Sequence, residues 1–139
     1  MTKSNDVRTS ARSSRRPSGQ KKRKAFRLGL QAETQAAWLL RLKGYRILGH
    51  RVRTVSGEID LIAKRGQTLA IVEVKARSHQ TDALQAVTPA LQRRLTRAAG
   101  VWLAAHPRYA SASIRYDIVA IAPRRLPLHL ANAFEAREV

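Results

Sequence analysis

Three residues in the middle of the chain, Asp60, Glu73 and Lys75, have the side chains that metal-dependent hydrolysis of a phosphodiester bond requires. Two carboxylates supply the hard oxygen ligands that Mg²⁺ and Mn²⁺ prefer. An ion held there can bind a phosphate group and lower the pKa of an attacking water molecule. The lysine can stabilise the negative charge that develops on the phosphate oxygens. These residues therefore form a candidate phosphodiesterase centre, with Mg²⁺ or Mn²⁺ as cofactor and with Asp60 and Glu73 as the expected metal ligands.

A β-hairpin is predicted to bring the two acids together. Apolar residues dominate 58–64 and 68–76, and the connector 65–67 contains a glycine, which is typical of a hairpin turn. The simplest register places Asp60 opposite Glu73. Directly opposed like charges destabilise a strand pair, and a divalent cation between them would relieve the repulsion. Ordinary ion pairing between neighbouring strands is the alternative at this spacing.

Strand parity predicts which side chains share a face, because successive side chains of a strand alternate. Glu73 and Lys75 are expected to point the same way, and so are Glu58, Asp60 and Ile62. The same register places Glu58 opposite Lys75. The second strand of the hairpin is apolar on both faces, as a buried central strand is, and carboxylates in such a strand need a partner or an ion.

Other ionisable residues are weaker candidates. Glu33 lies in a predicted helix and is a third candidate acid, although a glutamate facing solvent is the alternative there. For Asp117, pairing with Arg115 or capping of its strand is favoured over metal binding. The four histidines, at positions 50, 79, 106 and 129, lack the spacing of metal ligands. A catalytic histidine is therefore not expected.

Charge dominates the composition, because 27 lysines and arginines face 9 acidic residues and give 139 residues a net charge of +18. Such an excess indicates a polyanionic partner, and nucleic acid is expected. The absence of cysteine excludes disulfides, thiolate metal sites and cysteine nucleophiles, and it suits a reducing compartment, so a cytoplasmic location is expected. No apolar run reaches the roughly 18–20 residues that span a bilayer, and no membrane partner is expected.

The length suits one folded domain, and the composition changes at about residue 26. Residues 1–26 are rich in Ser, Arg and Lys and have too few large apolar groups to offset chain entropy, so they are predicted to be a disordered basic tail. Two roles for the tail are open, an electrostatic arm that contacts the polyanion and a solubilising extension. Residues 27–139 are predicted to form the domain.

Hydrophobic periodicity predicts an α/β (α+β) domain in which helices cover a mixed sheet. The elements follow the order α-β-β-β-α-β, and Thr88-Pro89 is a helix start because a capping hydroxyl precedes a proline. Around the hairpin, the predicted ranges are a helix at 28–43, a strand at 45–53, a helical region at 82–105, a strand at 113–121 and a short strand near 128–131.

Two motifs carry a resemblance to a known family, Gly57-Glu-Ile-Asp-Leu-Ile-Ala63 and Val72-Glu-Val-Lys-Ala-Arg77, which follow Gly44-Tyr-Arg-Ile-Leu48 in this order. With them the chain resembles the YraN-type family of bacterial proteins over roughly residues 28–134. That family is similar to PD-(D/E)XK endonucleases, and among these to Holliday-junction resolvases. The motif pair is specific in combination, although each half alone is common.

The resemblance implies a restriction-endonuclease-like core, a central mixed β-sheet flanked by helices, in a nuclease-like domain over 27–139. It implies that Asp60, Glu73 and Lys75 hold the catalytic positions and that Glu33 is a catalytic acid carried by the first helix. DNA is the implied substrate, in branched or structured form, and a homodimer is expected by analogy. The side chains expected to contact nucleic acid are Lys21, Lys22, Arg23, Lys24, Arg51, Arg53, Arg77, Gln92 and Arg93.

The chain departs from the family pattern at three positions, where Ala32 replaces a usual Gly, Arg51 a usual Asn and Leu91 a common Lys. None of these changes removes an expected metal ligand, but the last one puts substrate contacts of the second helix in doubt. Two other functions remain open. The chain can be a nucleic-acid-binding protein, of DNA or of RNA and the ribosome, that keeps the nuclease fold without catalysis, or a structural partner that uses its basic surface.

Overall fold

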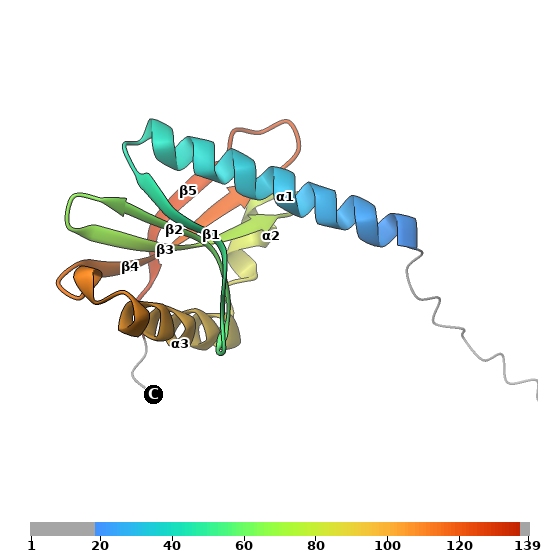
Figure 1. The fold of residues 1–139 in the computed structure, drawn as a ribbon. Helices are drawn as coiled ribbons and strands as arrows, with labels where there is room; N and C mark the ends of the chain where they lie inside the picture. Colours follow the sequence, from blue (N-terminus) through green and yellow to red (C-terminus); the bar gives the residue numbers. More distant parts are fainter. Residues whose placement is uncertain (1–18, 137–139) are drawn as a thin grey trace, which may run out of the picture.

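The computed structural model describes residues 19–136, of which residues 20–28 are described by their backbone alone. Five strands form one mixed sheet in the order β1-β2-β3-β4-β5 (Figure 1). The first three strands pair antiparallel, β4 runs parallel to β3, and β5 pairs antiparallel with β4. The strands are β1 (Arg46–Thr54), β2 (Gly57–Arg65), β3 (Thr68–Ala76), β4 (Ser113–Ile121) and β5 (Leu128–Phe134). The predicted fold class, a mixed sheet flanked by helices, is confirmed.

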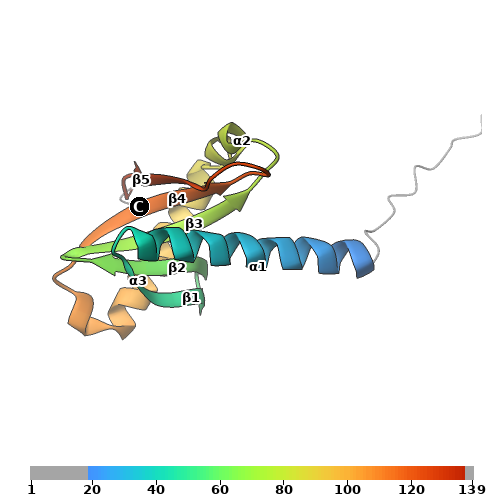
Figure 2. The ribbon, with the colours of Figure 1, turned by 90° about the horizontal axis from the view of Figure 1, so that it is seen from above.

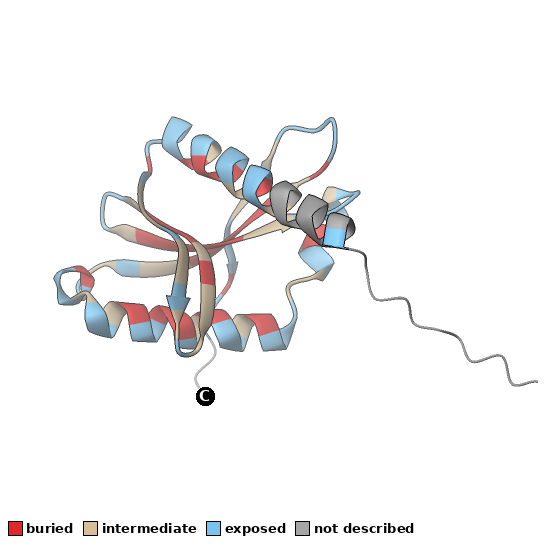
Figure 3. Ribbon diagram, turned by 45° about the vertical axis from the view of Figure 1, so that its right-hand side comes forward, coloured by how far each residue is buried: buried red, intermediate tan, exposed pale blue. Residues whose placement is uncertain are grey.

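The sheet lies between two helices, α1 (Gly19–Leu42) on one face and α3 (Pro89–Ala105) on the other (Figures 1 and 2). Each helix buries an apolar stripe against its face of the sheet (Figure 3). On the α1 side, Leu40 packs with Leu61 and Val72 in one cluster. On the α3 side, Leu95 packs with Ile62 in a second cluster. The apolar strands of the hairpin are therefore covered on both faces, as their sequence predicted.

The connection from β3 to β4 is helical, because parallel neighbours need a long crossover. It contains the short helix α2 (Gln80–Gln85) and then α3, so the predicted helical region over 82–105 divides in two. The Thr88 hydroxyl accepts a hydrogen bond of 3.2 Å from the Leu91 backbone N–H, and Pro89 is the first residue of α3. The predicted start of this helix is confirmed. A turn of 3₁₀ helix, η1 (Pro107–Tyr109), then leads to β4.

The first helix is longer than predicted. Its backbone is helical from Gly19, so residues 19–26 of the predicted disordered tail lie in α1. The sequence from 20 to 28 contains no proline or glycine and is rich in Lys, Arg and Gln, which favour helix once a neighbouring turn exists. The rest of the tail, residues 1–18, lies outside the described residues. At the other end Gly44 has φ +90°, a conformation that favours glycine, and it follows the last helical turn.

The last strand is also longer than predicted. Strand β5 extends to Phe134, beyond the predicted end at Ala131, and Asn132 within it has φ +54°. Across residues 19–136, no helix has both the length and the apolar character that crossing a bilayer requires.

Candidate functional site

The site begins where β2 separates from β3. The hairpin pairs run from Arg65↔Thr68 to Leu61↔Val72, which is the predicted register, and Gly66 in its turn has φ +57°. The ladder ends at Leu61↔Val72, one step before Asp60 would oppose Glu73. Strand β2 continues with β1 alone as far as Gly57.

Asp60 occupies the gap between the two strands. Its Oδ2 accepts a hydrogen bond of 2.8 Å from the backbone N–H of Val74 on β3. A side chain therefore supplies an acceptor where the backbone pairing has ended. The bond ties Asp60 to β3 one residue after Glu73, so the two acids lie close together without forming a ladder pair.

The faces of β2 change at this point. Ile59 packs in the cluster under α3, whereas Leu61, two residues on, packs in the cluster under α1. A regular strand would place both on one face. The prediction that Asp60 and Ile62 share a face is wrong, because Ile62 lies under α3 while the Asp60 carboxylate lies close to Glu33 of α1. The face of β2 that points toward α3 therefore changes between Ile59 and Leu61, and β1 and β2 bend together toward α3 (Figure 1).

Three acids gather as a result. One carboxylate oxygen from each of Glu33, Glu58 and Asp60 lies within 4.8 Å of the others, close enough for one metal ion. The structure thus brings the helix-borne acid Glu33 to Asp60, as the resemblance implies. Glu58 was not among the predicted ligands, although its place two residues before Asp60 on the same strand was a usable indication.

The expected opposition of Glu58 and Lys75 is wrong. Glu58 is the cross-strand partner of Arg53 on β1, and their side chains form a long ion pair of 3.7 Å. Lys75 lies beside Ala120 of β4. The reason is the early end of the β2–β3 ladder, which leaves no partner strand opposite Lys75 on that side.

Burial, then the nearby carboxylate of Glu73 and, more weakly, that of Glu33 together raise the pKa of Asp60 to about 7, against the lowering effect of the hydrogen bond from the Val74 N–H. A carboxyl group titrates this high when its charged form is poorly solvated and surrounded by like charges. Such a group gains more from a bound cation than an exposed carboxylate does. Perturbed carboxyls of this kind cluster at functional sites.

Glu73 has two cationic partners. Its Oε1 lies 3.1 Å from Lys75 Nζ and 3.1 Å from Arg94 Nη2, and Glu73 is 4% exposed. Strand parity predicted that Glu73 and Lys75 share a face, which their ion pair confirms. Arg94 on α3 was missed. The predicted nucleic-acid contacts on α3 are Gln92 and Arg93, the neighbours of Arg94. Gln92 is half-buried and Arg93 is exposed. Only the docking of α3 against the hairpin reveals which of the three reaches the site.

Glu33 is held by Arg51 of β1, whose Nε lies 2.7 Å from Glu33 Oε2. Arg51 has φ +46°, a conformation that costs a residue with a side chain on the order of 1 kcal/mol or more. The neighbouring β1–β2 pairs are His50↔Leu61 and Val52↔Ile59, so Arg51 and Asp60 occupy facing positions between them. Asparagine, the residue that the resemblance leads one to expect here, adopts positive φ more readily.

The acids open into a cavity of about 500 Å³ that Glu33, Asp60, Glu73 and Lys75 line together. Arg77 lines the same cavity and is exposed, and its Nη1 donates a hydrogen bond of 2.7 Å to the Ala76 carbonyl. The four predicted catalytic residues therefore share one concave surface.

Of the predicted nucleic-acid contacts in the tail, Lys21 to Lys24 have a helical backbone in α1, and their side chains lie outside the described part of the chain.

A second buried carboxylate, Asp117 of β4, belongs to a separate polar cluster. Arg115 donates to both of its oxygens, at 2.8 and 2.7 Å, and also to the Tyr45 hydroxyl. His129 Nε2 lies 2.8 Å from Asp117 Oδ2. Burial raises the pKa of Asp117, but hydrogen bonds from His129, Arg115 and the Asn132 backbone outweigh this effect and lower the pKa to about 2. The favoured pairing with Arg115 is confirmed, and this acid is neutralised within the fold.

Comparison with known proteins identifies a family and relatives of this chain. Residues 32–121 match the family described as "Uncharacterised protein family UPF0102". A UPF0102 protein of Rhodopseudomonas palustris (strain BisB18) is 50% identical over 136 residues, covering 98% of this chain and 98% of the relative. A UPF0102 protein of Chelativorans sp. (strain BNC1) is 53% identical over 116 residues, covering 84% of this chain and 94% of the relative. The match spans every element of the site, from Glu33 to Arg94.

Proposed function

Because the chain belongs to the UPF0102 family, whose description carries no activity, we propose a function from the site itself, that of a Mg²⁺- or Mn²⁺-dependent endonuclease that hydrolyses phosphodiester bonds in DNA. One observation carries the proposal. Asp60 is half-buried between two separating strands, close to Glu33, Glu58 and Glu73, and its pKa is raised to about 7 by burial and by the charges of Glu73 and Glu33. A divalent cation is the ligand that such a cluster favours.

The donor set fits Mg²⁺ or Mn²⁺. All the donors are carboxylate oxygens, which are hard ligands, and the described residues place no histidine among them. Asp60 is common to two sets, the trio with Glu33 and Glu58 and the predicted pair with Glu73. We assign it as the central ligand, with the carboxylates around it completing the site. When bound, the ion would supply a polarised phosphate and a water molecule of lowered pKa.

The other side chains have roles that follow from their contacts. Lys75 Nζ, held 3.1 Å from Glu73 in the shared cavity, is placed to stabilise charge on a phosphate oxygen. Arg94 is 45% exposed at its side chain and offers a second cation on the same acid. Arg51 fixes the orientation of Glu33. The net charge of +18 supports a polyanionic substrate, and the resemblance to PD-(D/E)XK enzymes favours branched or structured DNA.

A second function has its own support. Glu73 is already neutralised by Lys75 and Arg94, and a closed ion-pair network of this kind is stable without a metal ion. A protein that binds DNA or RNA through the same basic surface, without cutting it, would keep this arrangement. Binding alone does not separate the two functions, because both predict an affinity that falls with salt.

Cleavage of a DNA panel separates them. Labelled junction, forked, blunt duplex and single-stranded DNA would be incubated with the full chain and Mg²⁺ or Mn²⁺. We expect metal-dependent cleavage that Asp60→Asn, Glu73→Gln and Lys75→Met each reduce at least about 100-fold, the range in which loss of one acid–base or charge-stabilising group falls. Glu135→Gln removes an exposed carboxylate and is the matched control. The nuclease function fails if the wild type cuts no member of the panel, or if Asp60→Asn cuts as fast as the wild type.

A further inference from the structure

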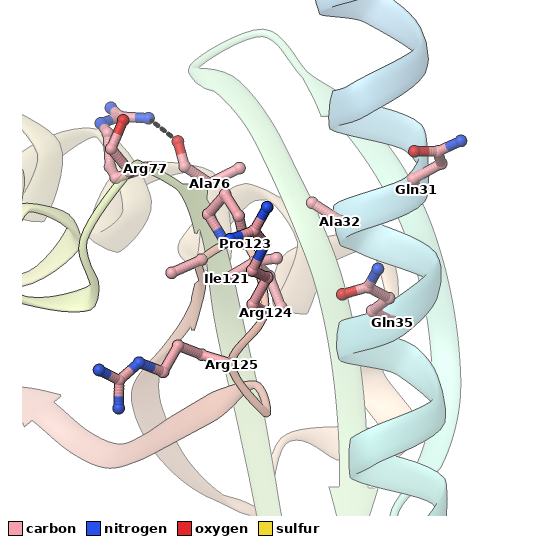
Figure 4. Close-up of a pocket in the computed structure, with 11 residues that line it drawn as sticks. Gln31, Ala32, Gln35, Ala76, Arg77, Ile121, Pro123, Arg124 and Arg125 are labelled. Carbon is pink, nitrogen blue, oxygen red and sulfur yellow. Dashed lines mark hydrogen bonds between the residues drawn. The ribbon is translucent and has the colours of Figure 1, made fainter.

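The site cavity continues into a second cavity along α1. This one has a volume of about 610 Å³ and shares Ala32, Ala76 and Arg77 with the cavity of the four acids. Figure 4 shows Gln31 and Gln35 of α1 on one side of it. The ends of β3 and β4 and the turn after β4 lie on the other side.

A third cavity, of about 670 Å³, shares residues 122–125 and Ser78 with the second. The turn between β4 and β5 therefore lines both cavities. This turn is fixed by two hydrogen bonds, from Gln80 Nε2 to the Leu126 carbonyl at 2.7 Å and from the Arg125 N–H to the Ala122 carbonyl at 3.4 Å. The second and third cavities together form a groove that leads away from the site, called here the side groove.

The side groove differs from the site in charge. Among the described residues that line it there is no aspartate or glutamate, whereas Arg77, Arg124 and Arg125 line it, and all three are exposed. Its lining also contains apolar groups, including Ile121 and Pro123. The side groove therefore offers cationic and apolar groups side by side.

We propose that the side groove binds a single-stranded segment of nucleic acid that runs to the catalytic acids past Arg77. A single strand exposes both its phosphates and its bases and sugars, so it matches a lining that has cationic and apolar groups together. Arginine guanidinium planes also stack on unpaired bases. A duplex keeps its bases stacked inside and would use only the arginines. The inference rests on the proposed function, because it takes the acid cluster as the place where this strand is cut.

Binding without cleavage tests the groove directly. Fluorescence anisotropy would measure the full chain in EDTA against a blunt duplex and against the same duplex with a single-stranded arm. The test variant is Arg124→Asn with Arg125→Gln, since asparagine tolerates the φ of +60° at residue 124. The control is Arg46→Gln with Arg97→Gln, which removes the same charge from exposed positions outside the side groove.

We expect the wild type to bind the armed duplex about tenfold more tightly than the blunt one, and the test variant to lose that advantage. The loss of two phosphate contacts on a single strand also lowers the slope of log K against log salt by about 1.4. The control keeps both the advantage and the slope. Urea midpoints of the two variants confirm that both fold.

The proposal is overturned if the test variant weakens blunt and armed duplexes equally, or if the control loses as much as the test variant. Its outcome is distinct from that of the nuclease function. An arm preference in EDTA that the test variant abolishes supports the groove even if no DNA is cut. Metal-dependent cleavage in which the test variant shows the wild-type preference for armed DNA refutes the groove and leaves the nuclease standing.

Discussion

Replacing Asp60 with asparagine is expected to change how folding stability depends on pH. The pKa of Asp60 is raised from 3.8 to about 7 in the folded protein, first by burial and then by Glu73. Between these two values Asp60 is protonated when folded and ionised when unfolded. Unfolding then releases a proton, so the free energy of unfolding falls as pH rises.

The magnitude follows from the size of the shift. Each pKa unit corresponds to about 1.4 kcal/mol, so the full shift is worth roughly 4 kcal/mol. Between pH 5 and pH 8 only the part from 5 to about 7 is lost, which is about 2.5 kcal/mol. The Asp60→Asn variant has no carboxyl group to titrate at this position, so its free energy of unfolding does not lose this contribution as pH rises. The lowered pKa of Asp117, at about 2, acts only below pH 4 and does not enter this window.

The assay is urea denaturation of wild type and variant at intervals between pH 5 and pH 8, without divalent metal. Stability of the wild type relative to Asp60→Asn should fall by about 2.5 kcal/mol across the range, while Glu135→Gln, at an exposed position, parallels the wild type. Any constant effect of the asparagine cancels in this comparison. Parallel pH curves for wild type and Asp60→Asn would refute the account of a carboxyl crowded by burial and like charges.

Other predictions concern the metal, the second acid cluster and the helix cap. At pH 8, Mn²⁺ at 100 times its dissociation constant should raise the free energy of unfolding of the wild type by about 2.7 kcal/mol and that of Asp60→Asn far less; equal stabilisation of both would place the ion elsewhere. Asp117→Ala should cost about 3–5 kcal/mol, because it leaves the Arg115 charge partly buried without its carboxylate; a loss below 1 kcal/mol, measured by urea denaturation, would contradict this. Thr88→Ala should cost about 1 kcal/mol through loss of the α3 cap, with exposed Thr81→Ala as the control that stays near the wild type.

Much of the hairpin and of the candidate site could be predicted from the sequence. Alternation of side chains along β3 is local, so the shared face of Glu73 and Lys75, which form an ion pair, followed from parity alone. The turn at Gly66 and the apolar strands determined the register as far as Leu61↔Val72. The hydroxyl of Thr88 followed by a proline identified the start of α3 in the same way. Each of these features depends on residues close together in the chain.

The tertiary structure decided which distant groups complete the site. Glu58 joins Glu33 and Asp60 only because β2 leaves β3 at Asp60 and rotates there, which strand parity does not predict. Arg94 reaches Glu73 because of the angle at which α3 packs against the sheet. The side groove forms between α1 and a turn about ninety residues later in the chain. The sequence by itself therefore identified Asp60, Glu73 and Lys75 as the candidate residues, and the packing of remote elements determined their neighbours, because burial and long-range contact exist only after the helices dock on the sheet.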